Sequence, residues 1–120
     1  MLIRIAEIVA ERATCQRKSV GAVIAREGRI LSTGYNGPAS GMPHCGPQCD
    51  PSRSCTRSIH AEANAIAFAA RNGVSLEGAT LYLTLSPCVS CAQLIANSGI
   101  IRVVYLERYR DPAGLIWLSE

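Results

Sequence analysis

The chain has 120 residues, which is enough for one compact domain and too few for two. A hydrophobic fraction of 48% excludes a disordered chain, and the low aromatic fraction of 5% indicates a core of small and branched side chains. Twelve Lys and Arg against nine Asp and Glu give a net charge of +3, with the basic residues scattered along the chain. Scattered charge and few aromatic rings argue against a nucleic-acid partner and favour a small anionic ligand.

No apolar run approaches the roughly 18 residues of a membrane helix, so we expect no membrane partner. Residues 1–11 contain Glu7 and Glu11 and do not resemble a secretory signal, which predicts a cytoplasmic protein. In a reducing compartment, six cysteines indicate metal binding more often than disulfides.

The first half of the chain predicts one helix and one hairpin. Residues 2–13 carry apolar side chains at helical spacing and predict an amphipathic helix. Residues 20–25 and 29–35 are rich in β-formers and flank Glu27-Gly28, which predicts a β-hairpin. The following segment, residues 36–58, is rich in Gly and Pro and contains three cysteines; a loop this long is usually functional or held by a metal.

The second half predicts, in order, helix, strand, helix, strand and helix, over residues 60–73, 80–85, 87–99, 100–106 and 111–120. Ser86 is a plausible N-cap of the helix predicted over residues 87–99, with Pro87 at the first position of that helix. The final helix is expected to lead into a terminal strand that is missing from residues 1–120.

The order of elements predicts an α/β fold with helices on both faces of one sheet. We expect a single domain over residues 1–120, a three-layer α/β/α sandwich around one mixed sheet of four to five strands. The last two strands are expected to be parallel and joined by a right-handed crossover.

Two short motifs, His60-Ala-Glu62 and Pro87-Cys88-Val-Ser-Cys91, lie where a loop or strand enters a helix. The spacing of the two cysteines places both thiols on one face of a helical turn, where the helix N-terminus is expected to lower the pKa of a thiol. One His and two Cys form the three-ligand set of a catalytic zinc site, which leaves the fourth position to water. Glu62 is then close enough to contact that water without displacing it.

Either motif alone is a weak indication, because C-x-x-C also occurs in redox pairs and in structural zinc half-sites. Together they match H-x-E…P-C-x-x-C, the pattern of zinc-dependent nucleobase deaminases. The combination therefore predicts a catalytic zinc.

The chain resembles the cytidine and deoxycytidylate deaminase superfamily, and within it the deoxycytidylate (dCMP) deaminases. The matching stretches are VGAVI at 20–24, GYNG at 34–37, HAEANAI at 60–66, AARNG at 69–73, LSPCVSC at 85–91 and SGI at 98–100. GYNG, a Cys-rich loop and HAExNAI in succession are more diagnostic of dCMP deaminases than the zinc motif. The resemblance implies a cytidine deaminase-like fold and hydrolytic deamination of dCMP to dUMP and ammonia, supplying dUMP for thymidylate synthesis.

The resemblance also assigns roles in the reaction. Zinc held by His60, Cys88 and Cys91 lowers the pKa of its water. Glu62 takes a proton from this water and delivers it to N3 of the cytosine ring, acting as general base and then as general acid. Hydroxide adds to C4, and ammonia leaves.

Four further residues are candidates for nucleotide contacts. The resemblance implies that Asn36 and Tyr109 bind the nucleotide, although Asn36 alone would equally fit a left-handed turn and Tyr109 an edge aromatic. Asn64 is placed either to hydrogen-bond the substrate or to cap a loop. Arg71 matches a position near regulatory and subunit contacts, although an Arg at a helix end also stabilises the helix dipole.

The resemblance further suggests a second, structural zinc. Four cysteines outside the catalytic motif are its expected ligands: Cys15, Cys45, Cys49 and Cys55. His44 is the expected substitute for one of them, and Ser58 stands where some relatives carry a Glu ligand. The alternative is that some of these cysteines are buried apolar thiols.

Regulation by dCTP and dTTP, with Mg²⁺ bound to the regulatory nucleotide, and assembly into a hexamer are also implied by the resemblance. Two alternative functions remain: another deaminase of the superfamily, acting on free cytidine or tRNA adenosine, and a non-catalytic interaction module stapled by zinc. Glu62 argues against the second alternative, because a purely structural zinc site needs no adjacent carboxylate.

Overall fold

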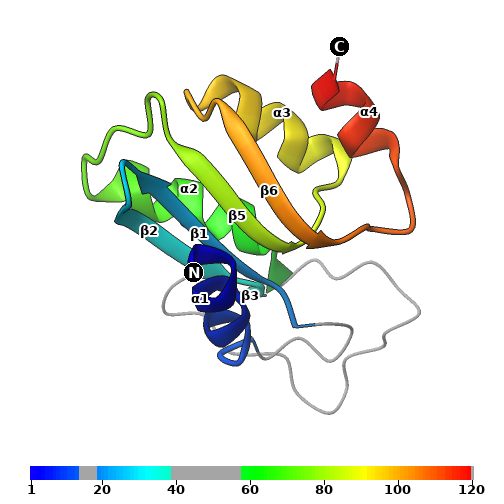
Figure 1. The fold of residues 1–120 in the computed structure, drawn as a ribbon, viewed down its shortest axis with the longest axis horizontal. Helices are drawn as coiled ribbons and strands as arrows, with labels where there is room; N and C mark the ends of the chain where they lie inside the picture. Colours follow the sequence, from blue (N-terminus) through cyan, green and yellow to red (C-terminus); the bar gives the residue numbers. More distant parts are fainter. Residues whose placement is uncertain (14–18, 39–57, 120) are drawn as a thin grey trace.

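The computed structural model describes residues 1–13, 19–38 and 58–119 (Figure 1). Their elements are α1 (Leu2–Ala10), β1 (Gly21–Arg26), β2 (Arg29–Tyr35), β3 (Gly37–Pro38), β4 (Ser58–Ile59), α2 (Ala61–Arg71), β5 (Thr80–Leu85), α3 (Val89–Asn97), β6 (Arg102–Glu107) and α4 (Ala113–Ser119). The predicted helices and the four predicted strands occur in the predicted order, and the short strands β3 and β4 are additional. In the described residues, no helix has the length and apolar character needed to cross a membrane.

The main sheet is mixed and has the strand order β2-β1-β5-β6. Strand β1 is antiparallel to both β2 and β5, whereas β5 and β6 are parallel, as predicted. The β1–β2 hairpin turns at Glu27 and Gly28, whose φ angles of 53° and 77° belong to a two-residue turn that follows the strand twist. These pairings confirm the predicted hairpin and the predicted mixed sheet.

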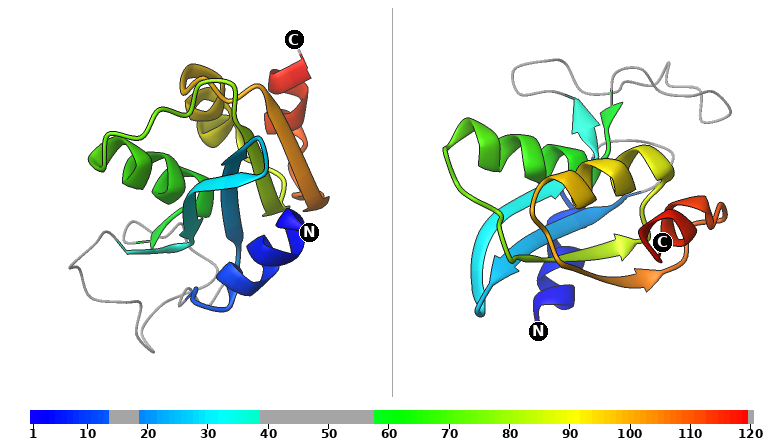
Figure 2. Two further views of the ribbon diagram at one scale, coloured as in Figure 1. Left: turned by 60° about the vertical axis from the view of Figure 1, so that its left-hand side comes forward. Right: turned by 90° about the horizontal axis from the view of Figure 1, so that it is seen from above.

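Helices cover both faces of this sheet: α2 and α3 lie on one side, and α1 lies on the other (Figure 2). This arrangement confirms the predicted three-layer sandwich. Strand β1 is buried along nearly its whole length because both of its faces are covered.

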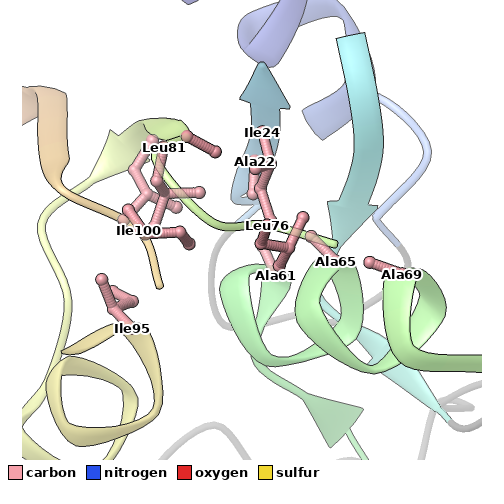
Figure 3. Packing of buried hydrophobic residues seen from close by; sticks show 11 residues of the cluster. Ala22, Ile24, Ala61, Ala65, Ala69, Leu76, Leu81, Ile95 and Ile100 are labelled. Carbon is pink, nitrogen blue, oxygen red and sulfur yellow. The ribbon is translucent and has the colours of Figure 1, made fainter. Parts of the chain in front are cut away.

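The core fills the space between the sheet and the helices α2 and α3 (Figure 3). Its large side chains include Ile24, Leu81 and Ile95, all of them fully buried or nearly so. The fully buried residues that α2 contributes to this cluster are Ala61, Ala65 and Ala69, and the half-buried Ile66 packs against it. Small side chains on the inner face of α2 let its backbone approach the sheet closely.

The close approach is greatest at Gly34 in β2. A Cβ atom at this position would lie 2.4 Å from the carbonyl oxygen of Ala61 and 2.6 Å from the backbone nitrogen of Ala65. Next to it, the hydroxyl of the buried Ser32 donates a 2.7 Å hydrogen bond to the Ala65 carbonyl. Strand β2 and the first turns of α2 are thereby held together at backbone distance.

A second, two-stranded sheet lies at the ends of the segment that the sequence predicts as one long loop. Strands β3 and β4 pair antiparallel, with Gly37 opposite Ile59 and Pro38 opposite Ser58. Two-residue strands that contain Gly and Pro have no recognisable alternation, which explains why this pairing was not predicted. The pairing brings Asn36, which directly precedes β3, and His60, which directly follows β4, to the same region of the fold.

We expect Gly34→Ala to destabilise the protein, because the added methyl group collides with the backbone of α2 rather than with a movable side chain. The loss should be about 1–3 kcal/mol in the free energy of unfolding, measured by denaturant titration. Thr33→Ala is the matched control, since Thr33 is the neighbouring residue and is exposed. Equal stability of the two variants would contradict the close contact between β2 and α2.

Candidate active site

The predicted metal ligands meet at the N-termini of α2 and α3. His60 and Cys88 occupy the N-cap positions of the two helices, and neither helix has a side-chain cap hydrogen bond. Cys91 lies in the first turn of α3. The Nδ1 atom of His60 is 3.3 Å from the sulfur of Cys91 and 3.6 Å from that of Cys88. The structure therefore brings together the three side chains that the motifs single out.

This donor set fits zinc. The two thiols are free, and the three ligand atoms lie within 4.8 Å of one another. In a tetrahedral site with ordinary Zn–S and Zn–N bond lengths, a sulfur and a nitrogen ligand are about 3.5 Å apart. The observed N···S distances of 3.3 and 3.6 Å are close to that separation, so His60, Cys88 and Cys91 could hold the ion with little rearrangement.

The thiol of Cys91 is buried, and burial raises its pKa above the ordinary value, with the negative charges of Glu62 and Cys88 adding to the effect. The expected lowering by the helix N-terminus is therefore wrong for Cys91, because desolvation and the neighbouring acids outweigh the dipole. Two thiols and a carboxylate placed together are electrostatically compatible with a divalent cation. Metal binding at this site is expected to release protons.

Glu62 lies in the first turn of α2 and is almost completely buried, with 4% of its surface exposed. Burial raises the pKa of its carboxyl group, while its own backbone N–H, the charge of His60 and the Cys91 thiol act in the opposite direction. A buried carboxyl group beside the ligand cluster is well placed to accept and return a proton.

Asn36 lies between β2 and β3 and is buried. Its side-chain oxygen accepts a 2.7 Å hydrogen bond from the backbone N–H of Val20. The backbone N–H of Asn36 donates in turn to the Val20 carbonyl at 3.2 Å. Among the described residues other than glycine, only Glu27 has a positive φ, so the left-handed explanation for Asn36 is wrong. Its contact with a nucleotide stays a prediction.

Asn64 lies in α2, two residues after Glu62. Its amide nitrogen donates to the backbone carbonyls of Tyr35 at 2.9 Å, Ile59 at 3.3 Å and Gly37 at 3.4 Å. The structure thus gives Asn64 the loop-holding contacts of one alternative. A substrate contact by Asn64 stays a prediction, and it would involve the oxygen of the side chain.

Ser86 holds Tyr109 instead of capping α3. Its hydroxyl accepts a 2.7 Å hydrogen bond from the backbone N–H of Tyr109, and its own N–H donates to the Glu107 carbonyl at 2.9 Å. The predicted helix start at Pro87 is therefore wrong: α3 begins at Val89 because Ser86 still pairs with the end of β6. The half-buried Tyr109 is placed beside the cysteine motif, although its contact with a nucleotide is untested.

Gly114, in α4, is a part of the site that the sequence analysis missed. A Cβ atom on Gly114 would lie 2.0 Å from the carbonyl oxygen of Pro87 and 2.9 Å from that of Cys88. Helix α4 therefore packs directly on the backbone of the motif that carries a metal ligand. A glycine inside a predicted helix, where it lowers helix propensity, was the available indication.

Arg71 is separate from this cluster. Arg71 is the exposed last residue of α2, at the opposite end of the helix from His60 and about 16 Å away along its axis. The predicted ligands of a second zinc lie outside the described residues: Cys15, His44, Cys45, Cys49 and Cys55.

An α/β/α sandwich with a His-Cys-Cys cluster at two helix N-termini and a buried glutamate beside it has the make-up of a zinc-dependent nucleobase deaminase. Residues 1–107 match the family model described as the cytidine and deoxycytidylate deaminase zinc-binding region. The chain belongs to the cytidine and deoxycytidylate deaminase family, which confirms the resemblance found in the sequence.

Relatives of known sequence and structure are similar over most of the chain. The deoxycytidylate deaminase of Enterobacteria phage T4 is 41% identical, with 90% of this chain and 77% of that protein covered. The deoxycytidylate deaminase of Mycobacterium phage D29 is 44% identical, with 84% and 88% covered. The crystal structure of the dCMP deaminase from cyanophage S-TIM5 in complex with dCMP and dUMP superposes with a TM-score of 0.91 at 33% identity, covering 98% of this chain and 87% of that one.

Changing Cys91 to Ser is expected to weaken zinc binding at least tenfold, because it removes the buried sulfur from the cluster. Zinc affinity can be measured by competition with a chromogenic chelator. The matched control is Ser90→Ala, which changes the exposed neighbouring residue of the same helix. Unchanged zinc affinity in the Cys91 variant would contradict this ligand assignment.

Proposed function

We propose that this protein catalyses the zinc-dependent hydrolytic deamination of dCMP to dUMP and ammonia. The observation that carries the proposal is the convergence of His60, Cys88 and Cys91 next to the buried carboxyl group of Glu62. The similarity to phage deoxycytidylate deaminases, and to a deaminase structure that contains dCMP and dUMP, supports dCMP as the substrate.

His60, Cys88 and Cys91 would hold the zinc ion through one nitrogen and two sulfurs. When bound, zinc supplies a Lewis acid that makes water a competent nucleophile near neutral pH. Glu62 accepts a proton from the attacking water and delivers it to N3 of the cytosine ring. A further proton transfer converts the amino group at C4 into ammonia, the C4–N bond breaks, and the carbonyl group of uracil remains.

Asn36 and Tyr109 are the proposed contacts to the nucleotide. The side chain of Asn36 is held in place by Val20, and the backbone of Tyr109 is held by Ser86. A residue that is fixed before the ligand arrives loses less conformational entropy on binding. The net charge of +3 favours a nucleotide that carries a phosphate.

Ammonia release from dCMP, deoxycytidine, cytidine and dCTP, and inosine formation in tRNA, test the proposed reaction and substrate together. We expect dCMP to be preferred by a large factor in kcat/KM. Glu62→Gln should lower kcat by about 10²–10⁴-fold and keep zinc bound, because it removes only the proton carrier.

Three outcomes would contradict parts of this proposal. A Glu62→Gln protein with near-normal turnover and intact zinc would remove the role of Glu62. Faster reaction with cytidine or tRNA adenosine would assign the protein to another branch of the family. No deamination of any substrate by the zinc-loaded protein would favour a non-catalytic interaction module.

We also propose that the product dUMP supplies thymidylate synthesis in the cytoplasm. By resemblance to the family, dCTP and dTTP would regulate the enzyme, with Mg²⁺ on the regulatory nucleotide, and the chain would form a hexamer. Arg71 is proposed to lie near the regulatory or subunit contacts. Its position at the far end of α2 from the ligand cluster is compatible with a role away from the reaction.

Curves of rate against dCMP concentration, with and without dCTP or dTTP in the presence of Mg²⁺, test this regulation. We expect dCTP and dTTP each to change the rate at low dCMP, because an effector that binds one conformational state more tightly than another shifts the population between them. Arg71→Ala should reduce both effects. Superimposable curves for the unmodified protein would contradict regulation by these nucleotides.

A second, structural zinc on Cys15, Cys45, Cys49 and Cys55, with His44 as a substitute ligand, is proposed on the resemblance alone. Metal analysis of the purified protein tests it, with two zinc ions per chain expected. One zinc ion per chain would reject the second site.

A further inference from the structure

The side-chain amide nitrogen of Asn64 carries two hydrogens and lies within hydrogen-bond distance of three backbone carbonyl oxygens. The hydrogen bond to Tyr35 is the shortest, at 2.9 Å, and uses one hydrogen. The carbonyls of Ile59 and Gly37, at 3.3 and 3.4 Å, are close enough to share the other. The donor capacity of this nitrogen is therefore fully used within the protein.

The three acceptors lie on the two segments that lead to the candidate site. Tyr35 ends β2 and Gly37 begins β3, so they are the neighbours of Asn36 on both sides. Ile59 ends β4 and directly precedes the metal ligand His60. One side chain therefore connects the segment of the proposed nucleotide contact with the segment of a proposed zinc ligand.

Asn64 is itself fixed relative to the reacting groups. Its backbone N–H donates to the carbonyl of His60 at 2.9 Å, in the first turn of the helix that carries Glu62. Strands β3 and β4 pair over only two residues each, and an isolated pairing this short is unstable in water. The β3–β4 pairing alone is therefore a weak connection between the two segments, and the Asn64 amide adds a connection of both segments to α2.

We infer that Asn64 is a positioning residue: its amide ties the backbone on both sides of Asn36, and the residue before His60, to helix α2. The proposed nucleotide contact, Asn36, and the metal ligand His60 are thereby held in fixed positions relative to Glu62. The part of this inference that concerns Asn36 rests on the proposed function. The part that concerns His60 rests only on metal binding.

Asn64→Ala tests the inference, with Asn72→Ala as the matched control. Asn72 is the C-cap residue at the other end of the same helix, and its side-chain amide donates to one backbone carbonyl, that of Phe68, at 2.8 Å. We expect Asn64→Ala to weaken zinc binding by up to about tenfold, which is at the lower end of the loss seen when a direct hydrogen-bond partner of a metal ligand is removed, because the amide contacts the residue before His60 and not His60 itself. Hydrogen exchange should accelerate in peptides covering residues 35–38 and 58–60, and KM for dCMP should rise. Asn72→Ala should change none of these.

Two outcomes would overturn the inference. A higher KM with unchanged zinc affinity and unchanged hydrogen exchange would make Asn64 a direct substrate contact. Zinc affinity and local exchange equal to those of Asn72→Ala would leave no positioning role. Zinc affinity and exchange do not depend on the substrate, so both remain decisive even if the protein does not deaminate dCMP.

A second pair of variants keeps the test decisive if Asn64→Ala does not fold. Asn64→Gln retains an amide donor, whereas Asn64→Asp has the same shape as Asn but places an oxygen against three carbonyl oxygens. We expect Asn64→Gln to bind zinc more tightly and to exchange more slowly in residues 58–60 than Asn64→Asp. Equal values for the two variants would contradict the role of the amide donor.

Discussion

The meeting of two helix N-termini is the constraint on which the rest of this site depends. It brings one imidazole nitrogen and two sulfurs from separate parts of the chain within 4.8 Å of one another, next to a buried carboxyl group. Cys91 and Glu62 are buried, whereas Cys88 is half-buried and His60 is exposed. Ionising the two buried acids together is costly without a compensating cation, which favours a divalent ion at the open side of the cluster.

Small residues make this meeting possible. The alanines of α2 and Gly34 of β2 let the helix that begins after His60 lie against the sheet at backbone distance. Gly114 does the same for α4 against the Pro87-Cys88 backbone. Each close approach leaves little room for displacement, so the ligands and the carboxylate are positioned by packed backbone and not by long side chains.

Residue spacing was sufficient to predict the helices, the hairpin, the mixed sheet and the zinc motif, because these follow from local periodicity and from short patterns. It was not sufficient to predict that Ser86 would bind the backbone of Tyr109, or that Asn64 would serve Tyr35, Gly37 and Ile59. Those contacts use backbone groups that only the tertiary fold brings near. The pKa of Cys91 was misjudged for a similar reason: the helix dipole is visible in the sequence, whereas burial is not.

The pairing of Pro38 with Ser58 has a consequence for how this protein can vary. Because paired strands are about 5 Å apart, the insert between these two residues must begin and end at nearly one point. Doubling the length of such an insert would add only about 0.6 kcal/mol of closure entropy. Changes in the length or composition of this insert can therefore leave the paired strands, and the residues that follow them into the site, where they are.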